Sequence, residues 1–161
     1  MNKARVLFVC LGNICRSPTA HGVFEQMVRA EQLSHVITVD SAGTGDWHVG
    51  RAPDERAVRA ARGRGYDLRH LRARQVCVDD FVHYDYILAM DRANLVDLKR
   101  LAPAHFSGTL NLFLDYARAP GTLEVPDPYG GGMDGFEQVL ALIEDASLGL
   151  LEHLKTRHKA G

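Results

Sequence analysis

The stretch VLFVCLGNICRSP, residues 6–18, decides the fold of this chain. Its first half is apolar and rich in β-branched residues, which is typical of a buried strand. Ser17 and Pro18 suit the N-cap and the first position of a helix, and an amphipathic segment follows them. The sequence therefore predicts a strand, a tight loop and a helix N-terminus, with Cys10 and Arg16 at the two ends of the loop.

A loop between a strand and a helix N-terminus is a good binding place for anions. Backbone N–H groups there lack intrahelical partners, and the helix dipole adds positive charge. Gly12 allows a tight turn and a close approach of a ligand to the backbone. Arg16 can hold two oxygens of one phosphate group with its planar fork. We therefore expect phosphate or other oxyanions to bind in this loop.

Cys10 lies at the floor of this predicted cradle. Helix N-termini and neighbouring cations favour the ionised form of a thiol, so the sequence predicts a thiolate at neutral pH. Ser17 is placed to donate a hydrogen bond to that sulfur. The thiolate can then attack a bound phosphate monoester in line, while the loop stabilises charge on the equatorial oxygens. An isolated cysteine at a strand end is usually a small core residue, but that interpretation does not account for the spacing to Arg16.

Cys15, in the same loop, has two interpretations. It is either a packed loop residue or a redox partner that captures oxidised Cys10 as a disulfide, which would block further oxidation.

The rest of the chain alternates between the two kinds of secondary structure. Strand-like runs occur at residues 4–9, 36–40, 86–90 and 109–113, and helical patterns at 18–32, 53–64, 92–101 and 135–155. Asp91 and Asp134 are predicted caps of the last two helices. We predict an α/β fold over residues 1–161: a single domain with a small, doubly wound, four-stranded parallel sheet flanked by helices. Ligands bind at the carboxyl ends of such strands, where Cys10 and the segment 41–44 would meet.

Composition limits the functional classes. A net charge of −1 gives no reason to expect nucleic acid as a partner, and no apolar run approaches the length that inserts in a membrane. Three cysteines without zinc-like spacing fit neither a disulfide framework nor a metal finger, and no secretory signal pattern opens the sequence. We therefore expect a cytoplasmic protein in a reducing setting.

Positive charge is concentrated in one part of the chain. Residues 51–74 hold eight arginines, and Arg56, Arg59 and Arg62 fall on one face of a predicted helix. This face is either simply solvated or steers phosphorylated ligands toward the protein.

The segment PDPYGGG, residues 126–132, supplies a candidate general acid. Attack on a phosphate monoester expels an alkoxide or phenoxide, which an acid must protonate. Asp127 stands between two prolines that stiffen the backbone, although an Asp in such a setting is often only a turn former. Tyr129 and Trp47 together can wall a slot for a flat phenyl ring, and the alternative for Trp47 is a half-buried anchor.

The chain resembles the low-molecular-weight protein tyrosine phosphatases of the bacterial type along its full length. The matching pieces are VLFVCLGNICRSP (6–18), SAGTGDWHVG (41–50), RARQV (72–76), DYILAMDRANL (85–95) and VPDPYG (125–130). The resemblance implies hydrolysis of phosphotyrosine in proteins through a phosphocysteine, with no metal or other cofactor. It implies Cys10 as nucleophile, Arg16 as transition-state clamp and Asp127 as acid and then base.

The same resemblance implies roles for the residues around these three. Asn13 would hold the loop in its unusual conformation, with Ser17 and Ser41 in a supporting hydrogen-bond network. The phosphate and substrate site would be formed by Leu11, Gly12, Asn13, Ile14, Cys15, Ser17, Trp47 and Tyr129. Family members often carry a network histidine where this chain has Leu71, and His70 is a candidate substitute. Gly130 stands where many members have a second tyrosine, so a two-tyrosine phosphorylation switch is not expected.

Three alternatives remain open. Protein arginine phosphatases of the same family tend to carry threonine at the position of Ile14, whose apolar side chain favours a phenyl ring. Arsenate reductases share the fold and the cysteine loop but need a relay of further cysteines, and only Cys77 remains. A phosphate carrier or binding module would also use the loop, but it needs no general acid such as Asp127.

Overall fold

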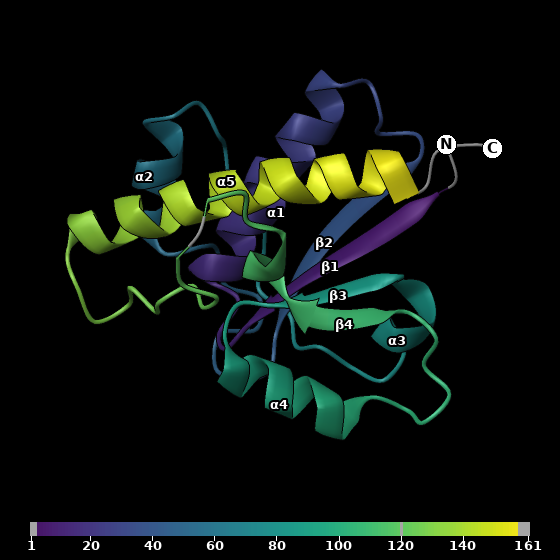
Figure 1. The fold of residues 1–161 in the computed structure, drawn as a ribbon. Helices are drawn as coiled ribbons and strands as arrows, with labels where there is room; N and C mark the ends of the chain where they lie inside the picture. The colour runs from purple at the N-terminus through teal and green to yellow at the C-terminus, as the bar shows by residue number, and fades with distance from the viewer. Residues whose placement is uncertain (1–2, 120, 158–161) are drawn as a thin grey trace.

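One parallel sheet organises the molecule. The computed structural model describes residues 3–119 and 121–157, so the ends of the expected domain, residues 1–2 and 158–161, lie outside it. Within those residues the sheet has four strands in the order β2-β1-β3-β4 (Figure 1). Their bounds are β1 Ala4–Cys10, β2 Ile37–Gly43, β3 Tyr86–Ala89 and β4 Thr109–Leu112. Every neighbouring pair is parallel, which confirms the predicted fold class.

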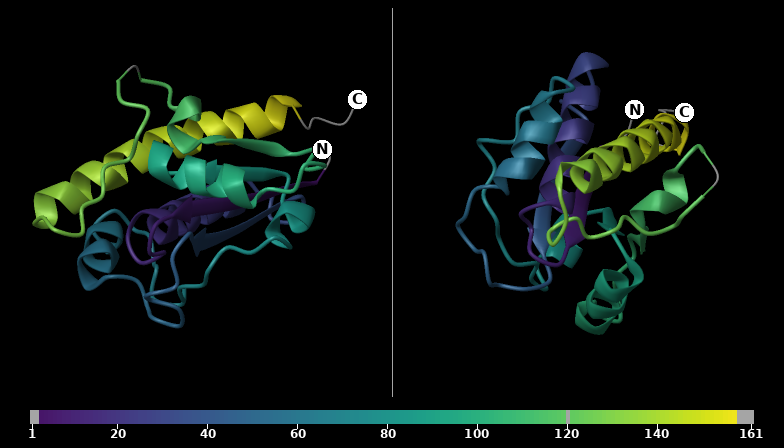
Figure 2. Two further views of the ribbon diagram at one scale, coloured as in Figure 1. Left: turned by 90° about the horizontal axis from the view of Figure 1, so that it is seen from below. Right: turned by 90° about the vertical axis from the view of Figure 1, so that its left-hand side faces the viewer.

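Helices cover both faces of the sheet (Figures 1 and 2). One face carries α1 (Arg16–Ala30), α2 (Glu55–Arg62) and the long α5 (Met133–Arg157), and the other carries α3 (Asp80–His83) and α4 (Arg92–Leu101). A short 3-10 helix, η1 (Phe113–Tyr116), follows β4. Neither α3 nor η1 was expected from the sequence, because each is a single turn without its own periodicity.

Alternating side chains of β1 build the two cores. Val6 and Phe8 pack under α1 and α5, whereas Leu7 and Val9 pack with the α4 side. Successive side chains of a strand point to opposite faces, so a strand covered by helices on both sides is apolar where both faces are buried, here over residues 6–10. All four side chains are fully buried, and this central strand ends at Cys10.

Two of the predicted helix starts are wrong. Helix α1 begins at Arg16 with Cys15 in the N-cap position, so Ser17 and Pro18 lie in the first turn. The Ser17 hydroxyl is directed to Cys10 instead of capping the helix. Helix α5 begins at Met133, because the Gly132 carbonyl already accepts a hydrogen bond from Gly135 N, and Asp134 lies in its first turn.

The Asp91 cap is confirmed. The Asn94 backbone N–H donates to Asp91 Oδ1 over 2.8 Å, and the Asn94 side chain accepts from Asp91 N. This capping box places Asp91 firmly at the start of α4, directly after β3.

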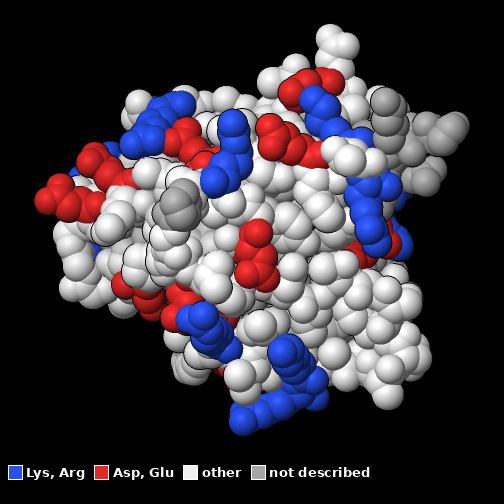
Figure 3. Space-filling view, viewed as in Figure 1, with Lys and Arg blue, Asp and Glu red and all other residues white. Residues whose placement is uncertain are grey.

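The surface mixes charges of both signs. Acidic and basic side chains alternate over the face in Figure 3. Within residues 3–119 and 121–157, no helix combines the length and the apolar character needed to cross a membrane.

Candidate active site

The loop after β1 wraps around the sulfur of Cys10. The thiol is 2% exposed and lies at the last residue of the strand. Asn13 N donates to Cys10 Sγ over 3.3 Å, and the Ser17 hydroxyl lies 3.0 Å from the same sulfur. An N–H and a hydroxyl directed at one sulfur stabilise negative charge on it.

Asn13, rather than Gly12, makes the unusual turn in this loop. Its φ is +57°, in the left-handed region. Its side-chain amide donates to Ser17 Oγ over 2.7 Å, and its carbonyl oxygen accepts from Arg74 N over 3.0 Å. Gly12 serves a different purpose: a Cβ there would lie 2.9 Å from the His48 ring, so the glycine admits that ring.

Arg16 is held at the first position of α1. Its guanidinium is 3% exposed. Nη1 donates to Asp91 Oδ2 over 2.7 Å and to the Val125 carbonyl over 3.1 Å. Since Asp91 also caps α4, the arginine is fastened to the carboxyl end of β3. Its other terminal nitrogen, Nη2, remains directed toward the cavity and lies 3.9 Å from Asp127 Oδ2.

Asp127 approaches this group from far along the chain. Its side chain is 49% exposed, and its Oδ1 accepts a hydrogen bond from Tyr129 N over 3.1 Å. Its neighbour Val125 donates its N–H to the Met90 carbonyl, just beyond β3. The late Pro/Gly segment is therefore brought to the sheet edge where Cys10 lies.

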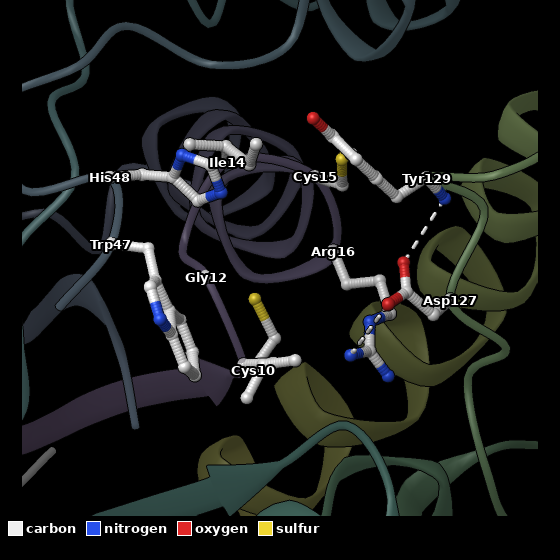
Figure 4. Close-up of a pocket in the computed structure, with 10 residues that line it drawn as sticks. Cys10, Gly12, Ile14, Cys15, Arg16, Trp47, His48, Asp127 and Tyr129 are labelled. Atoms are coloured by element: carbon white, nitrogen blue, oxygen red, sulfur yellow. Dashed lines mark hydrogen bonds and ion pairs between the residues drawn. The ribbon is translucent and has the colours of Figure 1, made fainter. Parts of the chain in front are cut away.

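A cavity of about 220 Å³ lies between these groups (Figure 4). Cys10 Sγ points into it, with Trp47 and His48 on one side and Tyr129 and Asp127 on the other. Trp47 is 67% exposed, and its indole covers Gly45, where a Cβ would collide with the ring. The lining residues are Cys10, Leu11, Gly12, Ile14, Cys15, Arg16, Trp47, His48, Asp127 and Tyr129.

Cys15 lines the same cavity with a protonated thiol. Burial, and then the negative charge of Asp54, raise the pKa of Cys15 to about 12. The thiol is 6% exposed. At neutral pH it is therefore not a nucleophile.

Ser41 belongs to a network beside the loop. Its hydroxyl is 3.0 Å from Nδ1 of His21, a buried histidine of α1. The side chain of His70 is 60% exposed and lies 3.9 Å from Glu25, so His70 does not take the network position. The sequence did carry a signal for His21, because it stands one helical turn after Ser17.

The predicted arginine face of α2 is divided in the structure. Arg59 and Arg62 are exposed, but Arg56 turns toward the Asp127 loop and donates to the carbonyls of Tyr129 and Gly131. A charge pattern cannot reveal this difference, since it depends on where a distant loop packs.

The described residues, 3–119 and 121–157, hold no cluster of three or more His, Cys, Asp or Glu side chains that could bind a metal ion. The polar groups around the cavity include the Cys10 thiol, the Arg16 guanidinium, the Asp127 carboxyl and a backbone N–H group of the loop. Such a set suits the binding and transfer of a phosphoryl group.

Comparison with known proteins agrees with this geometry. The family model "Low molecular weight phosphotyrosine protein phosphatase" matches residues 5–160. A low molecular weight protein-tyrosine-phosphatase of Streptomyces coelicolor is 47% identical over 150 residues, which cover 91% of each chain. A protein tyrosine phosphatase from Entamoeba histolytica, solved with Hepes in the active site, has a TM-score of 0.93 at 37% identity and covers 97% of this chain and 99% of its own.

A Drosophila arginine phosphatase structure is also similar, with a TM-score of 0.87 at 32% identity over 93% of this chain and 97% of its own. The fold is thus shared by proteins named for two phosphorylated side chains. The family itself is settled by the match over nearly the whole chain: the protein belongs to the low molecular weight phosphotyrosine protein phosphatase family.

Proposed function

We propose that this protein hydrolyses phosphotyrosine side chains of other proteins through a phosphocysteine intermediate. The observation that carries the proposal is the meeting of Cys10, Arg16 and Asp127 around one cavity, although Asp127 is more than a hundred residues away in the chain. A binding module needs the first two groups, whereas only an enzyme has use for the third.

In the first step the Cys10 thiolate attacks phosphorus and an S–P bond forms. Asn13 N–H and the Ser17 hydroxyl hold the sulfur, and the backbone N–H groups of the loop and Arg16 Nη2 stabilise the charge on the equatorial oxygens. The P–O bond to the tyrosine breaks, and Asp127 donates its proton to the departing phenolate oxygen.

In the second step a water molecule attacks the phosphorus of phosphocysteine. The Asp127 carboxylate takes a proton from that water, and the P–S bond breaks. The products are inorganic phosphate and the Cys10 thiolate, so the cycle is closed without a metal or redox cofactor.

The walls of the cavity support an aryl substrate. Ile14 offers an apolar surface, and Trp47 and Tyr129 stand on opposite sides of the opening. A phenyl ring between them gains contact that a flexible phosphoserine side chain cannot provide. The specific partner is thus a phosphotyrosine-containing protein.

Turnover of an aryl phosphate by the purified protein, with chelator present, tests the proposal. We expect many turnovers per protein molecule for the wild type and none for C10S, which should still bind inorganic phosphate. Stoichiometric labelling of Cys10 without turnover would contradict an enzyme and support a phosphate carrier. A panel of phosphotyrosine, phosphoserine and phosphoarginine peptides tests the substrate, and a preference for phosphoarginine would overturn the assignment to tyrosine.

Asp127→Ala tests the general acid separately. We expect hydrolysis of aryl phosphates to slow by about 10²–10⁴-fold, and most for poor leaving groups, which need the proton. An equal loss for good and poor leaving groups would exclude Asp127 from this role.

We further propose that residues 1–161 act as one domain in the cytoplasm, without a nucleic-acid partner and without insertion into a membrane. The near-complete family match supports one domain. A reducing compartment keeps the Cys10 sulfur reduced and available for attack.

A further inference from the structure

We propose that Arg56 is a positioning residue that holds the Asp127 loop over the cavity, an inference that rests on the proposed function of Asp127. Arg56 lies in the first turn of α2, a helix that contributes no side chain to the cavity lining. Its guanidinium nevertheless reaches the backbone of the segment 126–132.

Arg56 makes four side-chain hydrogen bonds in two directions. Nη1 donates to the Gly131 carbonyl over 2.7 Å, and Nη2 donates to the Tyr129 carbonyl over 2.9 Å. On the other side, Nε and Nη2 donate to the two carboxylate oxygens of Asp54 over 3.1 and 3.0 Å. The fork is thus fastened at one end while it holds the loop at the other.

Two aromatic rings lie against the same guanidinium. Its central carbon lies 4.6 Å from the centre of the Phe136 ring and 5.6 Å from that of Tyr129. Phe136 is 3% exposed and belongs to the core under α5. Cation–π contact with a buried ring adds a restraint on the position of the guanidinium.

The loop has few other restraints. Within residues 3–119 and 121–157, Arg56 is the one side chain from outside the segment 126–132 that hydrogen-bonds to its backbone. Nothing lies within 4 Å of an ideal Cβ at Gly130 or Gly132, so these glycines are not packed against the body. Pro128 is the buried residue of the segment, and the three exposed glycines after Tyr129 depend strongly on the other contacts that remain.

A continuous set of contacts joins this clamp to both halves of the chemistry. Asp54 N donates to the Ile14 carbonyl over 2.8 Å, which ties the start of α2 to the phosphate loop. At the other end, Tyr129 N donates to Asp127 Oδ1 over 3.1 Å. Arg56 therefore sets the distance between the loop that binds phosphate and the carboxyl group that protonates the leaving group.

The charge of Asp54 fits this role. Burial raises the pKa of the Asp54 carboxyl, but hydrogen bonds from the Arg56 side chain and backbone outweigh it, and the net pKa is lower than usual. The carboxylate thus stays ionised at neutral pH and keeps its hold on the guanidinium.

Arg56→Met tests the inference, with Arg59→Met as the matched control. Methionine keeps the apolar stem but removes every donor, and Arg59 is an exposed residue of the same helix without an ion pair among the described residues. Hydrolysis of a poor and a good aryl leaving group is measured for wild type, R56M, R59M, D127A and the double variant R56M/D127A. Because a misplacement of about 1 Å can cost 10²-fold, we expect R56M to slow the poor leaving group by about 10- to 100-fold and the good one far less.

The double variant separates positioning from general damage. If Arg56 acts through Asp127, R56M/D127A is no slower than D127A, and R56K lies between R56M and wild type. An additive loss, or an equal loss for both leaving groups in R56M, would overturn the inference. If D127A itself slows good and poor leaving groups equally, the result would instead count against the proposed function of Asp127.

Hydrogen exchange provides a readout that needs no catalysis. We expect amides of the segment 126–132 to exchange at least about tenfold faster in R56M than in wild type or R59M, because charged hydrogen bonds to the loop are lost. Unchanged exchange in R56M, with thermal unfolding showing a folded protein, would also overturn the inference. Exchange in R56M is also compared with exchange in R56K at equal thermal stability. Faster exchange in R56M under that condition cannot result from a general loss of stability.

Discussion

Replacement of Ser17 by alanine should affect one chemical step far more than the other. The Ser17 hydroxyl lies 3.0 Å from Cys10 Sγ and is fully buried. In S17A the sulfur loses a hydrogen bond to a charged group, worth about 1.5–3 kcal/mol. That free energy corresponds to about 10- to 150-fold in a rate.

The loss falls on the second step. When phosphocysteine breaks down, the sulfur leaves as a thiolate, and the Ser17 hydroxyl stabilises the charge that develops on it. In the first step the same hydrogen bond stabilises the thiolate before attack, so its removal lowers the stability of the reactant and not only that of the transition state. We therefore expect breakdown to slow by about 10- to 150-fold and phosphocysteine to accumulate, with a smaller change in its formation.

Rapid-quench kinetics with an aryl phosphate and mass spectrometry of the intact protein measure both steps. S17A should give a burst of phenol close to one equivalent and a protein heavier by one phosphoryl group. Ser147→Ala is the matched control, since this helical serine is also fully buried and its hydroxyl has no hydrogen-bond partner within the described residues. Slower formation with unchanged breakdown in S17A would refute the reasoning and assign Ser17 a role in loop conformation alone.

Three further predictions concern charge, packing and pH. Asp91→Asn keeps a good cap for α4 but leaves the buried Arg16 without the Asp91 carboxylate, and the loss of such a pair costs up to about 3–5 kcal/mol of stability. Bound inorganic phosphate should therefore raise the Tm of D91N more than the Tm of wild type, and equal Tm shifts would contradict the pairing. Gly149→Ala places a Cβ 1.7 Å from the Tyr116 carbonyl oxygen. Urea unfolding should show a loss of unfolding free energy of at least about 1–3 kcal/mol while kcat changes little, and an unchanged urea midpoint would disprove this tight contact. The pKa of Cys15 is raised to about 12 from its ordinary value of 9.0, so above pH 9 the unfolded chain loses this proton while the folded chain keeps it. The free energy of unfolding therefore falls as pH rises toward 12, by up to about 1.4 kcal/mol per pH unit, and it should fall less steeply in C15A than in wild type.

The order of strands and helices could be predicted from the sequence because the local sequence pattern of these elements agrees with their place in the fold. Strand β1 is apolar and buried at every position except the exposed Arg5, as expected for a strand with helices on both faces, and it was predicted to within one residue. Helix α4 was predicted over its observed bounds, since Asp91 and Asn94 form a capping box that is local in sequence. Prediction of a helix boundary is secure where the cap itself is local.

Prediction from local sequence patterns failed where a side chain contacts a residue outside its own helix or loop. Ser17 was expected to cap α1, but a buried hydroxyl 3.0 Å from a sulfur serves the site instead. His48 lines the cavity because Gly12 leaves room for its ring, a relation between two loops that no spacing reveals. Arg56 was grouped with Arg59 by helical periodicity, although its environment is decided by a loop that follows some seventy residues later.

The position of Val125 explains why the acid arrives from so late in the chain. Its N–H donates to the Met90 carbonyl, and its own carbonyl accepts from Arg16 Nη1 over 3.1 Å. Val125 thus continues the backbone hydrogen bonding beyond the carboxyl end of β3, and at the same time it holds Arg16 of the phosphate loop. Since β3 lies next to β1, any segment paired beyond the end of β3 comes to lie beside Cys10. The acid two residues further on is therefore placed by the strand order, and its final orientation is left to the Tyr129 N–H and the Arg56 clamp.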